Sequence, residues 1–150
     1  MYINKLILFL LIFNSHIFSL FAKSNPDVFI FSKITNHVYI AHPGLVKRIN
    51  STSTIIVGRN FLTVVESQTD VFMATALIRG IRQRISKLPI KYLIFSHFHL
   101  DHILGAEAFL HENPALIIIA HQNTAGHIAL HGINEQTSWV MMDPKNKAGI

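Results

Sequence analysis

The sequence predicts an α+β fold of one domain, in which a single β-sheet carries its helices mainly on one face. Two pairs of β-rich runs come first, an amphipathic helical repeat follows, and two apolar runs of strand length then alternate with further helical segments. The chain has 150 residues, of which 50% are hydrophobic and 14% charged, so it can bury a core. The bare sheet face needs a partner, and the polar stretch after Ile133 does not supply one.

The N-terminus predicts a secretory signal peptide over residues 1–22. Lys5 supplies the positive charge, and an apolar run at residues 6–13 is interrupted at Asn14, which makes it too short to span a bilayer comfortably. We expect cleavage after Ala22, a periplasmic or secreted product and no stable membrane anchor after cleavage. An uncleaved membrane anchor is the alternative.

Two β-hairpins are predicted next. Each consists of two β-rich runs joined by turn residues, namely residues 28–34 with 37–41 and residues 54–57 with 62–66. Thr35-Asn36 forms the first turn, and His42-Pro43-Gly44 ends the first pair. The second turn is expected around Gly58.

An amphipathic helix is predicted after the second hairpin. Thr69 or Asp70 can cap its N-terminus, and Leu88-Pro89 ends it. Apolar residues recur at helical spacing between these limits, at Ala74, Leu77, Ile78, Ile81 and Ile85. The remaining predicted elements are a buried strand at residues 90–95, a helix at 103–112, a second buried strand at 115–120 and a helix at 123–131.

The composition limits the kinds of partner and site. The chain contains no cysteine, so it has no disulfide and no thiolate metal ligand. The formal net charge is +5, and the basic residues between Arg79 and Lys91 fit a solvated helix face better than a phosphate-binding patch. We therefore expect a small-molecule substrate and no nucleic-acid partner, and the number of chains in the assembly stays open.

Four ligand-type side chains follow the buried strand at residues 90–95. His97 and His99 are two residues apart in an extended stretch, so both imidazoles can point to one side. Asp101 and His102 stand at the start of the next helix. Imidazole and carboxylate groups bind zinc, and they also suit iron and manganese. The pattern predicts a divalent metal site at the carboxyl end of this strand.

With its His-Phe-His-Leu-Asp-His segment at residues 97–102, the chain resembles the metallo-β-lactamase superfamily, whose signature is His-x-His-x-Asp-His after a buried strand. The resemblance extends from about Val28 to Gly132. It implies the first half of a four-layer αββα sandwich, and hence a domain over residues 23–150 that is C-terminally incomplete. Residues 88–109 look most like exported zinc hydrolases of the quinoprotein-relay and sulfur-oxidation type.

The resemblance also implies roles for the four residues. His97 and His99 would bind a first zinc ion, and Asp101 and His102 a second, with the remaining ligands lying farther along the family's chain. Asp101 would have a catalytic role as well, because it can orient the attacking water or take its proton.

Two positions depart from the family pattern. Glu66-Ser67-Gln68 stands where the family usually has Asp-x-Gly, and we assign Glu66 no role. Leu104-Gly105 stands in place of a Gly-Gly pair, so the start of the following helix is expected to sit slightly differently.

The resemblance implies an exported zinc-dependent hydrolase that uses one or two metal ions. Metal-bound hydroxide would attack the carbonyl of an ester, thioester, lactone or β-lactam. The alternative is a non-catalytic exported metal-binding module, or an inactive fragment of such an enzyme.

Overall fold

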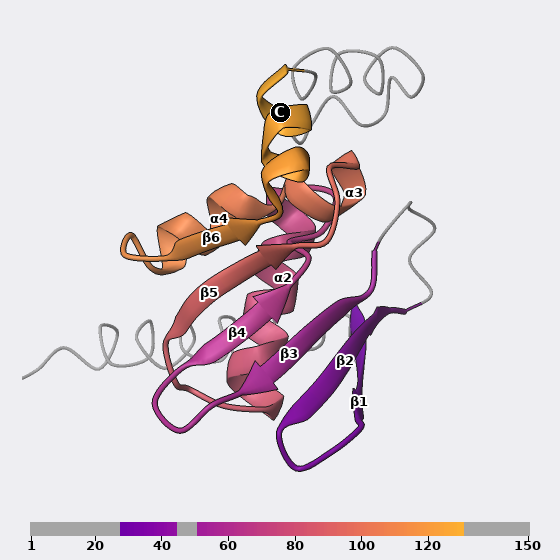
Figure 1. The fold of residues 1–150 in the computed structure, drawn as a ribbon. Helices are drawn as coiled ribbons and strands as arrows, with labels where there is room; N and C mark the ends of the chain where they lie inside the picture. The colour runs from indigo at the N-terminus through magenta and orange to yellow at the C-terminus, as the bar shows by residue number, and fades with distance from the viewer. Residues whose placement is uncertain (1–27, 45–50, 131–150) are drawn as a thin grey trace, which may run out of the picture.

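The computed structural model describes residues 28–44 and 51–130 of the chain. Six strands form one mixed sheet in the order β1-β2-β3-β4-β5-β6, with helices packed against it (Figure 1). The predicted α+β class is therefore confirmed. The predicted signal peptide and the polar tail after Ile133 lie outside the described residues.

The first four strands form two antiparallel hairpins, as predicted. Their bounds are β1 Phe29–Lys33, β2 Val38–Pro43, β3 Ser53–Val57 and β4 Leu62–Val65. Thr35 closes the first turn, because its Oγ1 accepts hydrogen bonds from the backbone N–H groups of His37 and Val38, both at 3.1 Å. In the second turn the N–H of Gly58 donates to the carbonyl of Phe61 at 2.9 Å.

The end of β2 differs from the prediction, because the strand continues through Pro43. Past Ala41, which is the last residue of β2 paired with β3, β1 is the only described strand that pairs with β2. Proline lacks an N–H and is tolerated where one side of a strand is not hydrogen-bonded. The N–H of Gly44 then donates to Val28 at 2.8 Å, which extends the β1–β2 pairing.

Helix α2 spans Val71–Arg84 and is the predicted amphipathic helix, although it ends at Arg84, before the predicted end at Leu88-Pro89. Asp70 is its N-cap, with the side chain accepting a hydrogen bond from the N–H of Met73 at 2.7 Å. Arg82 and Arg84 lie in the last turn, where positive charge is favourable next to the unpaired carbonyls.

The second half of the described chain adds two parallel strands. Strand β5 spans Ile90–Phe95, as predicted, and lies between β4 and β6, which spans Ile117–Ala120. Residues 122–130 are helical. Because β4, β5 and β6 run in the same direction, their carboxyl ends reach the same edge of the sheet.

The helix predicted at residues 103–112 is two helices, α3 Leu100–Ile103 and α4 Ala106–Glu112. The break falls at Gly105, whose N–H donates to the carbonyl of Gln68 at 3.0 Å instead of continuing a helix. A tertiary hydrogen bond to a distant turn thus divides a segment whose local pattern is helical throughout.

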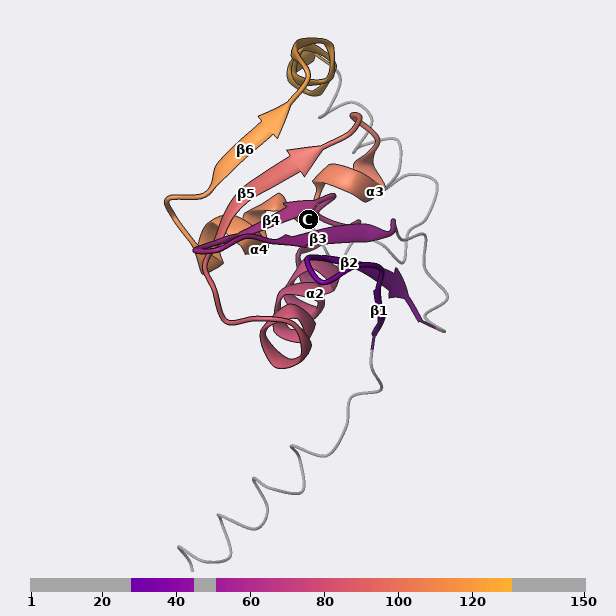
Figure 2. The ribbon, with the colours of Figure 1, turned by 60° about the horizontal axis from the view of Figure 1, so that its bottom comes forward.

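The core lies between the sheet and two helices. Figure 2 shows α2 and α4 on the same face of the sheet, and their buried apolar side chains meet those of the strands. Arg82 ties the two helices together, because its Nε and Nη2 donate to Oε1 of Glu112 at 2.9 and 2.6 Å. Its Nη1 also donates to the carbonyl of Leu88.

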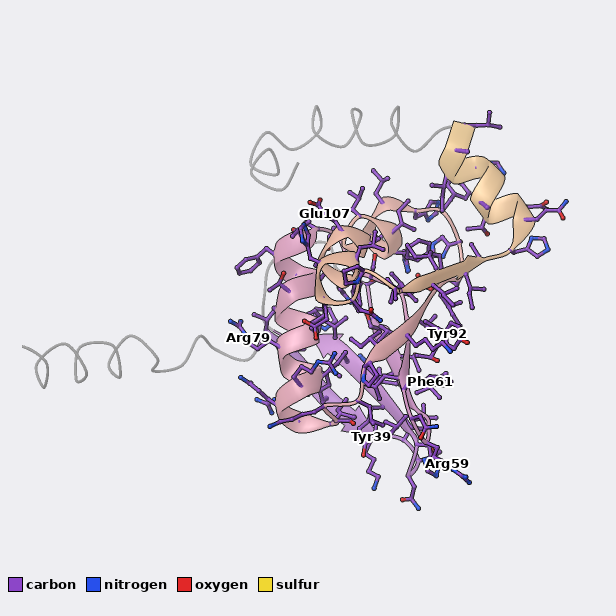
Figure 3. All side chains as sticks on the ribbon, turned by 90° about the vertical axis from the view of Figure 1, so that its left-hand side faces the viewer. Tyr39, Arg59, Phe61, Arg79, Tyr92 and Glu107 are labelled. Atoms are coloured by element: carbon purple, nitrogen blue, oxygen red, sulfur yellow. The ribbon has the colours of Figure 1, made fainter. Side chains whose placement is uncertain are left out.

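The other face of the sheet is covered by none of the labelled helices. Phe61 and Tyr92 lie there with ring centroids 5.2 Å apart, on the side opposite Arg79 of α2 (Figure 3). Among the described residues no helix is both long enough and apolar enough to cross a membrane.

Strand β6 is not the buried strand that its apolar sequence predicts. Ile117, Ile118 and Ile119 are 46%, 41% and 42% exposed. The strand lies at the edge of the described sheet and has β5 as its only described neighbour. A continuous apolar run predicts burial only where both faces of a strand are covered.

Candidate metal centre

The candidate site lies where β4 and β5 end side by side. Residues 96–102, here called the histidine loop, follow β5 and run into α3. Residues 66–68, here called the β4 turn, follow β4. Parallel neighbouring strands bring these two segments to the same edge of the sheet, although they are separated by about thirty residues of sequence.

His97 and His99 converge as the sequence predicts. Nε2 of His97 lies 3.1 Å from Nδ1 of His99. Two nitrogens bound to one tetrahedral zinc at about 2.0–2.1 Å would be separated by roughly 3.3 Å. The pair is therefore spaced for a shared metal ion. Oγ of Ser96 lies 2.8 Å from the other nitrogen of His97, Nδ1, and helps to hold that ring.

Asp101 and His102 form a second pair in the first turn of α3. Oδ2 of Asp101 lies 3.3 Å from Nε2 of His102, again close to the separation expected of two ligands on one zinc ion. The rings of His97 and His102 have centroids 4.0 Å apart, so the two pairs are adjacent. The structure thus brings the four residues that the sequence singled out together as two pairs, which the contact between His97 and His102 joins. Among the described residues, the group of three ligand atoms that all lie within 4.8 Å of one another includes His97 and His102 but neither His99 nor Asp101.

Glu66 is the site residue to which sequence reasoning assigned no role. It is 6% exposed, its Oε2 lies 3.1 Å from Nδ1 of His102, and its Oε1 accepts a hydrogen bond from the N–H of Ser96 at 3.1 Å. Glu66, His97 and His102 each offer a ligand atom within 4.8 Å of the others. The available signal was a carboxylate directly after a strand whose parallel neighbour ends in the histidine loop.

Backbone contacts join the β4 turn to the start of α3. The N–H and Oγ of Ser67 both donate to the carbonyl of His102, at 2.7 and 3.0 Å. A Cβ at Gly105 would lie 2.0 Å from the carbonyl oxygen of Ser67, so only glycine permits this approach. The position of His102 is therefore set by a segment far from it in sequence.

The β4 turn is itself held from its other side. Gln68 is fully buried, and its Nε2 donates to the carbonyl of Ser51 at 2.8 Å and to Oγ of Ser53 at 2.6 Å. Oγ of Ser53 donates to the carbonyl of Glu66 at 2.8 Å. Glu66 and Gln68 have φ values of 69° and 81°, a conformation uncommon outside glycine that these hydrogen bonds stabilise.

An aromatic contact borders the histidine loop. Phe98 stacks on His127, with ring centroids 4.6 Å apart and an interplanar angle of 17°. His127 belongs to the helical residues 122–130, so this contact joins the loop to the segment after β6.

The donor set fits zinc. Imidazole nitrogens and a carboxylate oxygen are its usual ligands, and the two close pairs offer them at suitable separations. Asp101 and His102 are each about one-fifth exposed at the side chain, so the site remains accessible from solvent.

Comparisons with known proteins agree with this fold. The sequence matches the family model of the metallo-beta-lactamase superfamily over residues 46–140. No curated protein matches it in sequence.

Two solved structures are similar in fold. One is the metallo-beta-lactamase FIM-1 from Pseudomonas aeruginosa in its mono-zinc form, with 20% identity and a TM-score of 0.58, covering 73% of this chain and 50% of FIM-1. The other is a metallo-beta-lactamase from Hirschia baltica, with 19% identity and a TM-score of 0.57, covering 69% of this chain and 48% of that one. The chain spans about half the length of these structures. On the family-model match and the shared fold, the chain belongs to the metallo-beta-lactamase superfamily.

Proposed function

We propose that the chain is part of an exported, zinc-dependent hydrolase that acts on the carbonyl of an ester, thioester, lactone or β-lactam. The observation that carries the proposal is the convergence of the two donor pairs, His97 with His99 and Asp101 with His102, at 3.1 and 3.3 Å. Membership of a superfamily composed mostly of hydrolytic metalloenzymes supports the reaction class. Export rests on the apolar run at residues 6–13.

Each pair has a separate task in this proposal. His97 and His99 would hold the first zinc ion through Nε2 and Nδ1, and Asp101 and His102 would hold the second through Oδ2 and Nε2. Bound zinc supplies a Lewis acid that polarises a carbonyl and lowers the pKa of water to about 7. Asp101 would orient the attacking water or take its proton, and the partial exposure of its carboxylate beside His102 supports this role.

A second candidate function is metal binding without catalysis. Each donor pair within residues 28–44 and 51–130 provides two protein ligands, and a hydrolytic zinc ion usually has three with one open position. The chain also spans about half the length of the solved structures it resembles. Zinc binding without hydrolysis would favour this second function.

The test removes the first donor pair. We expect the His97→Ala/His99→Ala variant of the full chain to lose its bound zinc, measured by elemental analysis after dialysis, and to lose any hydrolysis of nitrocefin or a thioester that the parent chain shows. The reason is that both imidazoles of the first site are removed.

His111→Ala is the matched control. His111 is 77% exposed at the side chain and contacts Glu107 on α4, away from the histidine loop. This variant should keep the parent's zinc content. Full zinc content in the double variant would contradict the assignment.

A further inference from the structure

Glu66 contacts both ends of the histidine loop. Its Oε1 accepts a hydrogen bond from the N–H of Ser96, the first residue after β5, at 3.1 Å. Its Oε2 lies 3.1 Å from Nδ1 of His102, in α3. One carboxylate therefore spans the loop from its first residue to its last.

The second of these contacts joins two buried polar atoms. Oε2 of Glu66 and Nδ1 of His102 are both shielded from solvent and lie 3.1 Å apart, and neither makes a hydrogen bond to any described residue. A buried carboxylate oxygen left without a donor is costly. A proton on Nδ1 would give this close pair a donor and an acceptor, so that each atom could satisfy the other.

The two ring nitrogens of His102 thus face different groups. Nδ1 faces Glu66, whereas Nε2 lies 3.3 Å from Oδ2 of Asp101. A proton on Nδ1 leaves the lone pair on Nε2, the nitrogen that faces the proposed second metal. Metal-binding histidines commonly donate their other ring N–H to a carboxylate, which fixes both the tautomer and the ring orientation.

On this basis, and resting on the proposed function, we propose that Glu66 is a positioning residue for the second metal ion. Its carboxylate holds His102 as the Nδ1–H tautomer and presents Nε2 to the metal beside Asp101. The same carboxylate fixes the start of the histidine loop through Ser96. The site is thereby organised before any metal binds.

The backbone around Glu66 fits this role. Its φ of 69° is uncommon for a residue with a side chain, and two hydrogen bonds hold it. The N–H of Glu66 donates to the carbonyl of Ile94 at 2.9 Å, and its carbonyl accepts from Oγ of Ser53 at 2.8 Å. Strands on both sides of β4 thus maintain the conformation that places the carboxylate against His102.

Direct ligation by Glu66 is the competing arrangement, because Glu66, His97 and His102 could surround one ion. An ion bound between Glu66 and His102 would occupy Nδ1, the nitrogen nearest Glu66. Asp101 would then lie against the nitrogen that binds no metal. A positioning role gives a function to both contacts of His102, the one between Nδ1 and Glu66 and the one between Nε2 and Asp101. Direct ligation by Glu66 gives a function only to the contact at Nδ1.

The first test needs no variant and no metal. In the metal-free full-length chain labelled with ¹⁵N-histidine, NMR reports which nitrogen of His102 carries the proton. We expect the Nδ1–H form, and zinc titration should then shift the Nε2 signal of His102. An Nε2–H form without metal, or zinc bound at Nδ1, would overturn the proposal.

The second test measures zinc affinity by competition with a coloured chelator. Glu66→Gln keeps the shape of the side chain but removes its charge, and we expect the second zinc site, at Asp101 and His102, to lose about 10–100-fold in affinity. Glu112→Gln is the control, because it removes an equivalent charge from the ion pair with Arg82 and should leave both affinities unchanged. Equal affinities in the parent chain and Glu66→Gln would overturn the proposal.

Failure of the proposed function would give a different experimental result from failure of the positioning role of Glu66. A parent chain that binds no zinc contradicts the zinc site, yet the tautomer of His102 in the metal-free chain still decides the role of Glu66. The same NMR measurement decides it if Glu66→Gln does not fold.

Discussion

At the scale of single residues, the site depends on which nitrogen of each imidazole is presented. His97 offers Nε2 and His99 offers Nδ1, and these two atoms face each other at 3.1 Å. Oγ of Ser96 lies against the remaining nitrogen of His97, as the Glu66 carboxylate lies against that of His102. Neighbouring polar groups thus orient two of the three loop histidines before a metal ion is bound.

Gly105 gives a prediction at this scale. A methyl group there would lie 2.0 Å from the carbonyl oxygen of Ser67 and 2.7 Å from Cβ of Ala74. The nearer of these two atoms belongs to the backbone, which cannot move aside as a flexible side chain could. We therefore expect Gly105→Ala to lower the free energy of unfolding by about 3 kcal/mol, at the upper end of typical overpacking costs, as measured by urea denaturation.

Gly126→Ala is the matched control for this substitution. Outside its chain neighbours and the backbone of its own helix, no atom of the described residues lies within 4 Å of a Cβ at Gly126, which is in the helical segment 122–130. We expect this variant to gain roughly 0.5–1 kcal/mol, because alanine favours the helix. Equal effects of the two substitutions would contradict the close approach of Gly105, the N-cap of α4, to the β4 turn.

The residue scale is also where sequence reasoning missed part of the site. The four residues of the histidine loop were predicted, because they lie within six positions and on one strand end. Glu66 precedes Ser96 by thirty residues, and only the parallel pairing of β4 with β5 brings them together. A contact that depends on sheet register carries no local sequence signal.

At the scale of secondary-structure elements, the cap of α2 gives a prediction. Asp70 accepts a hydrogen bond from the N–H of Met73 at 2.7 Å. We expect Asp70→Ala to destabilise the chain by about 1 kcal/mol in urea denaturation, whereas Asp70→Asn keeps an acceptor and most of the stability. Equal loss in both variants would show that the charge matters, rather than the cap.

The elements differ in how well their own sequence predicts them. Strand β5 and the hairpin turns were predicted closely, because apolar periodicity and turn residues are local signals. The division between α3 and α4 was not predicted, because it follows from the hydrogen bond between the N–H of Gly105 and the carbonyl of Gln68. The exposure of β6 was not predicted either, because its place at the edge of the described sheet depends on how the strands are ordered and not on its own residues.

At the scale of the whole molecule, the family and the α+β class were predicted from the sequence, and both are confirmed. The prediction succeeded because the metal-binding pattern and the order of elements are both readable along the chain. The sequence also predicts helices mainly on one face of the sheet, and α2 and α4 both pack on the same face.

Metal binding should also change the stability of the molecule. Because the four predicted ligands are assembled only in the folded chain, zinc at a hundredfold excess over its dissociation constant should raise the free energy of unfolding by about 2.7 kcal/mol. Urea denaturation with and without zinc measures this difference. The His97→Ala/His99→Ala variant should lose most of it, and an undiminished effect there would locate the zinc elsewhere.

The most direct test of the zinc centre is a crystal structure of the zinc-loaded chain with anomalous data at the zinc edge. We expect a zinc peak about 2.0–2.1 Å from both Nε2 of His97 and Nδ1 of His99, as zinc–imidazole bonds require. A zinc peak remote from residues 97–102, or these four side chains pointing apart, would contradict it.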